Sequence, residues 1–356
     1  MKHKHYFNLA ILIIFLIGSA CKPKSNAPAK EEGNWNGCVI GMFTADSTAS
    51  FPKYGEEGIK AFESLIGHKI GSVLIYPSWQ DSFPTKECQM IVNQGAIPHL
   101  TWELYWPSIT WNTAPVDSNG YKAMDEVLAG KHDAYIKAFA LQAKSFGKTV
   151  QIRFLHEFNG NWYMWGGKKN GAAKGGPAKV VAVWKYVVNK FREVGADNVK
   201  WVWCPHGPSP DRSEESWNNI SNYWPGSDYV DWFGLDAYNW YPKDPWGGVR
   251  PYDSFTSCFR SLYDSCAKLG KQPMMIAEFA SGEFDYNGTK KADWIKDSFT
   301  KLKSEYPRIK IFTWFNIKKE LDWRVNSDSA AYKTFVDEMK DPYYIGSPHP
   351  MGGSCK

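Results

Sequence analysis

The chain has 356 residues, a formal net charge of +5 and an aromatic content of 16%, with 18 tryptophans. That length suits one large domain with a leader and exceeds the length of a small binding module. Tryptophan and tyrosine are more frequent than core packing requires, which favours a surface that binds flat rings. No block of basic residues resembles a nucleic-acid-binding surface, so we expect no nucleic-acid partner.

The first 34 residues have the pattern of an export signal followed by a tether. Lysines precede the apolar run Leu9–Ile17, which is too short to cross a bilayer but has the length of a signal-peptide core. Small residues then precede Cys21, as at the lipidation site of bacterial lipoproteins; an ordinary secretory signal is the alternative. We therefore expect a signal peptide over residues 1–20, lipidation of Cys21 and a tether over residues 21–34. The protein would be exported and held by its lipid on the periplasmic or cell-surface side of a bacterial membrane.

Six cysteines follow Cys21, and in an exported protein they could form disulfides. Cys258 and Cys266 share a predicted helix, where eight residues separate them by about 12 Å, too far for a disulfide. Cys38 and Cys355 lie near the two ends of the predicted domain, and a bond between them is one alternative. No Cys-x-x-Cys pair occurs, so a zinc cluster is not indicated. We expect no bound metal and no cofactor.

From Gly37 onward, short apolar runs alternate with helical stretches. This alternation predicts a (β/α)8 TIM barrel over residues 35–341 and a short C-terminal tail over residues 342–356, with an open doubly wound sheet as the weaker alternative. The predicted strands are Cys38–Thr44, Ile70–Tyr76, Ala96–Thr101, Thr149–Leu155, Val199–Trp203, Tyr229–Leu235, Met274–Ala277 and Ile309–Trp314. The predicted helices are Glu56–Ile66, Thr85–Asn93, Lys131–Phe146, Pro177–Val194, Glu214–Asn222, Ser254–Leu269, Thr289–Tyr306 and Ser329–Met339.

Two connections are predicted as loops. The segment Tyr105–Asp125 is interrupted by prolines and a glycine. The segment Gly166–Gly176 is rich in glycine and lysine but lacks the Gly-Lys-Ser/Thr ending of a P-loop. It therefore indicates a mobile loop over a cleft rather than a phosphate-binding loop.

Polar and aromatic residues gather at the carboxyl ends of six consecutive predicted strands, the end at which such barrels place their chemistry. Glu157 and Glu278 each directly follow an apolar run, on the fourth and seventh strands, which face one another across a closed barrel. Two opposed carboxyl groups beside tryptophans are typical of a glycosidase, in which one group is protonated and the other is ionised. The other candidate residues, all proposed to bind substrate, are His99, Trp102, Glu103, His156, Trp162, Trp203, Asp236, Tyr238 and Trp314.

Three other interpretations are weaker. An ion pair between Glu157 and Arg153 inside the barrel would give this glutamate a structural role. A metalloprotein that used His99, His156 and His206 would need a metal-ligand spacing that these histidines lack. A glycan-binding lipoprotein would use the same tryptophans but would not need two opposed carboxylates.

The stretch His156–Trp162, with the sequence HEFNGNW, resembles the hallmark of glycoside hydrolase family 26, and Trp165–Gly166 stands behind it. The resemblance extends from about Gly37 to Met339 and implies a (β/α)8 barrel of a retaining clan. Weaker motifs occur in the same order as in the family: Pro98–His99 with Trp102–Glu103, Asp236–Tyr238, Ile276–Phe279 and Thr313–Trp314.

The resemblance also implies roles for individual residues. Glu157 would be the general acid/base and Glu278 the nucleophile of a double displacement, with Tyr238 orienting Glu278 by a hydrogen bond. His156 would stand beside the acid/base. The residues that would line the subsite of the sugar under attack are His99, Trp162, Asp236 and Trp314.

The expected activity is endo-β-1,4-mannanase, with a polysaccharide as substrate and a monomer as the acting form. Mixed-linkage β-glucanase and β-1,3-xylanase are the alternatives within the family. Two departures leave the sugar open: Phe315 follows Trp314, and Cys204–His206 stands where many relatives carry a Ser-Pro-Asn-like turn.

Overall fold

The computed structural model describes residues 36–44, 55–105, 116–117, 120–207, 215–243 and 248–346. The predicted signal peptide, tether and lipidation at Cys21 lie outside the described residues, as does Cys355. Cys38 is buried in the first strand, and its pairing with Cys355 stays a prediction. Cys258 and Cys266 share one helix, as predicted, with free thiols.

Eight parallel strands close into a barrel. Each pairs with its neighbour in the chain, and the last pairs with the first from Val39 opposite Ile311 to Thr44 opposite Asn316. The predicted (β/α)8 barrel is thereby confirmed. The eight strands are β1 (Cys38–Thr44), β2 (Ser72–Ile75), β3 (Ile97–Trp102), β6 (Val150–Phe154), β7 (Val199–Trp203), β8 (Trp232–Asn239), β9 (Met274–Ser281) and β12 (Ile309–Asn316).

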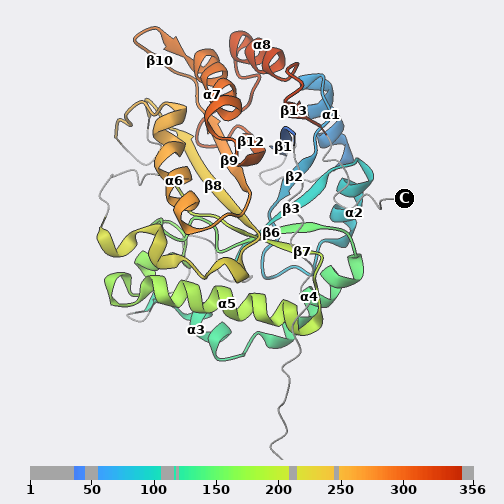
Figure 1. Ribbon diagram of the computed structural model, residues 1–356, viewed down its shortest axis with the longest axis vertical. Coiled ribbons are helices and arrows are strands. Elements are labelled where there is room, and N and C mark those ends of the chain that lie inside the picture. Colours follow the sequence, from blue (N-terminus) through green and yellow to red (C-terminus); the bar gives the residue numbers. More distant parts are fainter. Residues whose placement is uncertain are drawn as a thin grey trace, which may run out of the picture. The chain divides into compact units, whose positions relative to one another are not determined.

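Helices surround the strands (Figure 1). Their ends follow local sequence signals: the first ends at Gly67 in the left-handed conformation, and Ser254 caps the start of another through its side chain. No helix among the described residues is long and apolar enough to cross a membrane. The helices are α1 (Glu56–Ile66), α2 (Thr85–Asn93), α3 (Lys122–Leu128), α4 (Asp133–Phe146), α5 (Gly176–Val194), α6 (Phe255–Leu269), α7 (Lys291–Glu305) and α8 (Ser329–Glu338).

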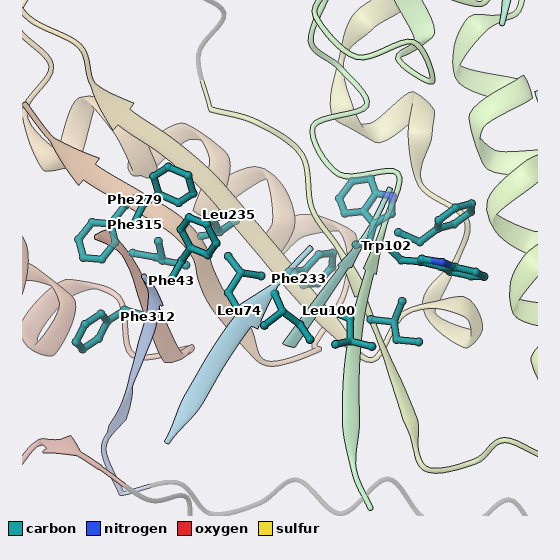
Figure 2. Close-up of a cluster of buried hydrophobic side chains, with 14 of the residues drawn as sticks. Phe43, Leu74, Leu100, Trp102, Phe233, Leu235, Phe279, Phe312 and Phe315 are labelled. Atoms are coloured by element: carbon teal, nitrogen blue, oxygen red, sulfur yellow. The ribbon is translucent and has the colours of Figure 1, made fainter. Parts of the chain in front are cut away.

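Side chains alternate between the lumen and the outer face along each strand. The outer face carries large apolar residues that pack against the helices, and Figure 2 shows part of this core, including Leu100, Trp102 and Phe312. A smaller apolar cluster joins β1 to β7 through Val39 and Val202, so it fills the lumen itself. The carboxyl-end half of the lumen is polar, and its fully buried residues include His99, Thr101, Gln151, Arg153 and Thr313.

Three connections differ from the prediction. The predicted helix Glu214–Asn222 is, in its described part, two 3-10 turns (Ser216–Asn218 and Ile220–Tyr223). The predicted loop Tyr105–Asp125 contains a short hairpin of β4 (Val116–Asp117) and β5 (Gly120–Tyr121), and α3 begins within it. The predicted tail begins with β13 (Tyr344–Ile345), which pairs with β1.

The glycine-rich segment is packed rather than open. It forms 3-10 turns over Gly167–Lys169 and Ala172–Lys174, and a Cβ atom on Gly176 would lie 2.2 Å from the carbonyl oxygen of Gly167. The glycines therefore allow two backbone segments to touch, which corrects the expectation of a mobile loop. A second hairpin, β10 (Asp285–Tyr286) with β11 (Thr289–Lys290), precedes α7.

Candidate active site

Glu278 lies in the carboxyl-end half of β9 and accepts hydrogen bonds on both carboxylate oxygens. Oε1 accepts from the Tyr76 hydroxyl and the Arg153 guanidinium, and Oε2 accepts from the Tyr238 hydroxyl. The contact predicted between Tyr238 and Glu278 is thereby confirmed. Donors from the ends of three different strands hold a carboxylate whose residue is 7% exposed.

Arg153 supplies the positive charge next to Glu278. Its Nε and Nη2 donate to the hydroxyl of Thr101 at 2.9 and 2.6 Å, and its Nη1 donates to Asp236. The guanidinium is fully buried and forms ion pairs with Asp236 and Glu278. The alternative that paired Arg153 with Glu157 is therefore wrong.

Glu157 lies just beyond the end of β6, on a sharp turn. Leu155 and Glu157 have φ values of 48° and 53°, in the left-handed region that residues other than glycine rarely adopt. The backbone N–H of Glu157 donates to the carbonyl of Cys204 at 2.8 Å, which helps to hold the turn. Strain of this kind costs about 1–3 kcal/mol per residue and is characteristic of functional sites.

The carboxyl group of Glu157 has neutral neighbours where Glu278 has a guanidinium. Its Oε2 accepts the indole N–H of Trp162, and Nε2 of His206 lies 3.7 Å from its Oε1. Trp162, which was expected to line the sugar subsite, thus contacts the acid/base candidate, and its part in binding sugar stays a prediction. Both glutamates are 7% exposed, so their different neighbours, not different burial, distinguish them.

The two glutamates have opposite ionisation states at neutral pH. Burial and, second, the negative charge of Glu278 raise the pKa of Glu157 to about 8. Burial acts on Glu278 as well, but Arg153 and the hydroxyls of Tyr238 and Tyr76 outweigh it and lower its pKa below the usual 4.5. Glu157 therefore carries a proton while Glu278 carries a negative charge.

The other predicted polar residues differ in their burial. Glu103 is half-buried at the end of β3, and burial, with the charge of Glu278, raises its pKa to about 8. His156 is 1% exposed, and its ring centroid lies 4.4 Å from that of Tyr163. His99 and Asp236 have no exposed surface, so the expectation that they line the sugar subsite is wrong.

Three predicted tryptophans lie in the core. Trp102, Trp203 and Trp314 are at most 1% exposed. Trp102 stacks on Phe139 of α4 with ring centroids 4.2 Å apart, and the indole of Trp314 donates to the carbonyl of Trp323 at 2.8 Å. Each occupies an outward-facing strand position. The expectation that they bind substrate is wrong, because a side chain without exposed surface cannot stack on a sugar ring.

Three residues outside the predicted site contact the two glutamates: Tyr76, Arg153 and His206. Arg153 lies two residues after Gln151 on the same strand, so both side chains face the lumen. This alternation could have been used to find Arg153 from the sequence. Tyr76 directly follows β2, but no motif marks it. Among the described residues, no group of three or more His, Cys, Asp and Glu side chains lies close enough to hold a metal ion.

Aromatic rings surround Tyr238. Its ring centroid lies 5.2 Å from that of Trp323 and 5.8 Å from that of Phe315. Trp323 is buried in the connection between β12 and α8. The position of this connection therefore bears on the orientation of Tyr238 and, through its hydroxyl, on Glu278.

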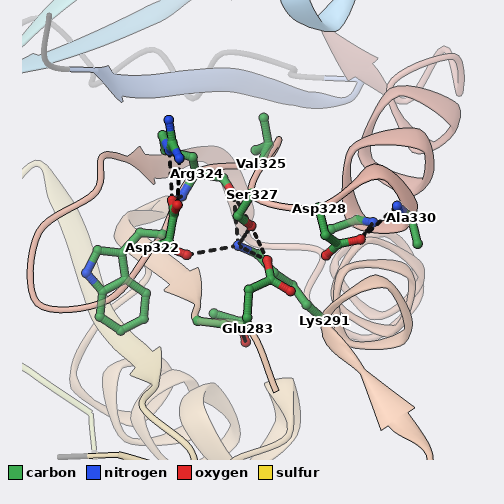
Figure 3. Close-up of polar contacts among 12 residues, drawn as sticks. Glu283, Lys291, Asp322, Arg324, Val325, Ser327, Asp328 and Ala330 are labelled. Atoms are coloured by element: carbon green, nitrogen blue, oxygen red, sulfur yellow. Dashed lines mark hydrogen bonds and ion pairs between the residues drawn. The ribbon is translucent and has the colours of Figure 1, made fainter. Parts of the chain in front are cut away.

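Lys291, at the start of α7, holds that connection (Figure 3). Its side chain is fully buried. The ammonium donates to the carbonyl oxygens of Asp322 and Arg324 and to the hydroxyl of Ser327, and it lies 3.4 Å from the carboxylate of Glu283. Three points of the connection are thus tied to α7.

A protonated and an ionised glutamate, held by separate strands at the carboxyl end of one (β/α)8 barrel, define an enzyme of the glycoside hydrolase class. The family model described as glycosyl hydrolase family 26 matches residues 81–339. The chain belongs to this family, as the resemblance of its HEFNGNW motif predicted.

The chain is similar in sequence to proteins with different named activities. Endoglucanase H of Acetivibrio thermocellus is 32% identical over 316 residues, which cover 86% of this chain and 31% of that protein. A mannan endo-1,4-beta-mannosidase of Bacillus subtilis is 29% identical over 238 residues, which cover 62% of this chain and 56% of that protein. The chain thus spans less than a third of the first relative's length and just over half of the second's.

The fold is shared with solved structures. A Bacillus subtilis mannanase, BCman, superposes with a TM-score of 0.62 at 18% identity, and the match covers 90% of both chains. At this identity the likeness shows the fold alone.

Proposed function

We propose that the protein is a retaining endo-β-glycanase that hydrolyses a polysaccharide by double displacement. The observation that carries this proposal is the pair of glutamates at the same end of the barrel with unlike partners: Glu157 accepts the indole N–H of Trp162, whereas Glu278 accepts from Arg153 and two tyrosine hydroxyls. A retaining glycosidase needs one carboxylic acid to protonate the leaving oxygen and one carboxylate to attack the anomeric carbon. The alternative of a glycan-binding protein without turnover gives no reason for this arrangement.

In the first step, the Glu278 carboxylate attacks the anomeric carbon while Glu157 donates its proton to the departing glycosidic oxygen. A covalent glycosyl–enzyme ester forms, and Glu157 is left as a carboxylate. In the second step, Glu157 takes a proton from water, the water oxygen attacks the anomeric carbon, and Glu278 leaves as a carboxylate. Arg153, Tyr76 and Tyr238 keep Glu278 ionised and oriented before attack and stabilise it again as a leaving group.

We propose mannan as the first polysaccharide to test, because the family resemblance suggested it and a mannan endo-1,4-beta-mannosidase is among the relatives. Mixed-linkage β-glucan is the second candidate. It is favoured by the higher identity, over more of this chain, to a protein named endoglucanase H. β-1,3-Xylan remains an alternative from the sequence.

Product release from the four purified substrates mannan, glucomannan, mixed-linkage β-glucan and β-1,3-xylan separates these candidates. Short manno-oligosaccharides from mannan would support endo-β-mannanase activity. Release from mixed-linkage glucan alone would keep the two glutamates and the mechanism and change the sugar to glucose. Proton NMR of the first product should show the β-anomer, and an α-anomer would contradict a retaining mechanism.

The Glu157→Gln variant tests the acid/base role. The amide that replaces the carboxyl group cannot donate the proton, so polysaccharide hydrolysis should fall by about 10²–10⁴-fold while polysaccharide binding persists. In the wild type, kcat/KM should fall as the pH rises through about 8, where Glu157 loses its proton. Glu193→Gln, on an exposed part of α5, is the control. Unchanged hydrolysis by Glu157→Gln would remove Glu157 from the mechanism.

We also propose that the protein is exported and anchored by a lipid on Cys21. Support comes from the sequence order of lysines, apolar run, small residues and cysteine, followed by a polar tether. A full chain expressed in a bacterium fed labelled palmitate should carry the label, and Cys21→Ala should lose it and leave the membrane fraction. A label retained by Cys21→Ala would contradict the proposal.

A further inference from the structure

His206 stands beside Glu157 and has no role in the steps described so far. Its backbone is fixed on both sides by one side chain: the Asn159 amide donates to the carbonyl of His206 at 3.0 Å and accepts its N–H at 2.8 Å. Asn159 lies two residues after Glu157. The segment that carries the acid/base residue therefore also sets the position of His206.

One hydrogen bond fixes the tautomer of His206. Nδ1 lies 3.1 Å from the carbonyl oxygen of Gly207, and a carbonyl oxygen only accepts, so Nδ1 carries the ring proton when the imidazole is neutral. Nε2 then carries a lone pair, and it lies 3.7 Å from Oε1 of Glu157.

His206 is neutral at neutral pH. Burial lowers its pKa to about 4, and the positive charge of Arg250 acts in the same direction. The Gly207 carbonyl and the charge of Glu278 act in the opposite direction and are outweighed. A neutral imidazole therefore faces a protonated carboxyl group.

The two oxygens of Glu157 are not equivalent. Trp162 donates its indole N–H to Oε2, so this oxygen is the carbonyl-type acceptor and the carboxyl proton belongs on Oε1. Trp162 also packs edge-on against the ring of His206, with centroids 4.8 Å apart and an interplanar angle of 79°. The proton on Oε1 thus faces the lone pair on Nε2.

We propose that His206 is a positioning residue that keeps the Glu157 proton on Oε1 and directs it for transfer, an inference that rests on the acid/base role proposed for Glu157. At 3.7 Å the two atoms are beyond the range of a direct hydrogen bond. The imidazole therefore orients the O–H group by attraction without retaining the proton. In the first step the O–H bond of Glu157 breaks, a new O–H bond forms on the departing sugar, and His206 stays neutral.

The test compares two leaving groups. The polysaccharide that the wild type hydrolyses needs its leaving oxygen protonated, whereas a 2,4-dinitrophenyl glycoside of the same sugar leaves as a stable anion and does not. His206→Asn keeps an amide near Gly207 and has no atom at the Nε2 position. It should slow polysaccharide hydrolysis roughly tenfold, a part of the 10²–10⁴ that a positioned acid contributes, and change dinitrophenyl release by less than about twofold.

His206→Gln places a polar atom near the position of Nε2 and should recover part of the lost rate. His206→Leu removes both ring nitrogens, carries the same expectation as His206→Asn and replaces it should His206→Asn not fold. His68→Asn is a matched control, because Nδ1 of His68 also lies close to the next residue's carbonyl, at 2.8 Å, in the connection between α1 and β2.

The outcomes separate this inference from the proposed function. Selective loss with the polysaccharide supports it. Equal loss with both substrates, or no loss with either, would overturn it while the wild-type activity leaves the proposed function intact. If the wild type hydrolyses neither substrate, the proposed function fails and the role of His206 fails with it.

Discussion

Among the described residues, two cations are buried towards the carboxyl end of the barrel, and their surroundings differ. Arg153 lies in the lumen between two carboxylates, Asp236 and Glu278. Lys291 lies at the start of α7 among three neutral oxygens and a single carboxylate, that of Glu283, which is 41% exposed. The charge of Arg153 is thus balanced by buried negative charge, whereas the charge of Lys291 is stabilised mainly by the dipoles of two carbonyl groups and a hydroxyl group.

This difference indicates that one cation controls the ionisation of a site residue and the other controls the packing geometry around it. The charge of Arg153 is what keeps Glu278 ionised despite burial. Lys291 has less to support its charge: burial lowers its pKa to about 8, and a cation at a helix start opposes the helix dipole. Its contacts instead fix the connection that carries Trp323, which packs on Tyr238. Arg153 therefore sets an ionisation state, whereas Lys291 sets a geometry.

Replacing the cation in the lumen should have the largest effect. Arg153→Met leaves the carboxylate of Glu278 buried without its positive partner, and removing one partner of a buried ion pair costs about 3–5 kcal/mol of unfolding free energy. Glu278 should then take up a proton at neutral pH, and kcat/KM should fall by about 10²–10³-fold. Urea unfolding and steady-state kinetics measure both effects.

The control for this variant is Arg260→Met. Arg260 pairs with Glu305 on the surface, with 37% of its side chain exposed, and should change the unfolding free energy by about 1 kcal/mol or less. Equal stability losses in the two variants would show that Arg153 has no special electrostatic role.

Removing one hydroxyl from Glu278 should have an intermediate effect. Tyr76→Phe removes a donor to Oε1 and leaves Arg153 in place. A hydrogen bond to a charged group contributes about 1.5–3 kcal/mol, so the loss of this one should raise the pKa of Glu278. Activity requires Glu278 ionised and is lost as the pH falls through this pKa, so the acidic limb of kcat/KM should move to higher pH.

The alkaline limb distinguishes a local effect from a general one. It reports the loss of the Glu157 proton near pH 8, and Tyr76→Phe should leave it nearly unchanged. Tyr186→Phe, which removes a hydroxyl that donates to Asp133, serves as the control. An acidic limb that stays in place would mean that Tyr76 does not help to hold Glu278 ionised.

The fold could be predicted because each strand is an apolar run between breaks. β1 and β7 have the predicted ends, since their runs stop where their ladders stop. β8 and β9 extend four residues beyond prediction, because backbone pairing continues through polar residues, with Asp236 opposite Glu278. The apolar runs therefore located the strands but underestimated the length of the two that carry Asp236, Tyr238 and Glu278.

The site could be predicted only in part. Glu157 and Glu278 were found because each directly follows an apolar run, and Tyr238 because it belongs to a motif. The buried tryptophans were misassigned because their number says nothing about which face of a strand they occupy. The contacts of Glu278 with Arg153 and Tyr76 join residues 125 and 202 positions apart, so they depend on how the barrel closes.

Replacing Lys291, the cation at the start of α7, should have the smallest effect of these three substitutions. The effect should be on packing geometry rather than on ionisation. Lys291→Met removes the ammonium, but Glu283 is exposed enough to be solvated, so no buried charge is left unpaired. The loss is limited to the donors of two carbonyls and a hydroxyl, which costs about 1–3 kcal/mol of unfolding free energy. Trp323 should then pack less tightly on Tyr238, lowering kcat/KM by about threefold to tenfold with both pH limbs in place. Lys296→Met, exposed on the same helix, is the control. A shifted acidic limb in Lys291→Met would show that this cation also acts on the charge of Glu278. The distinction between an electrostatic role for Arg153 and a geometric role for Lys291 would then be wrong.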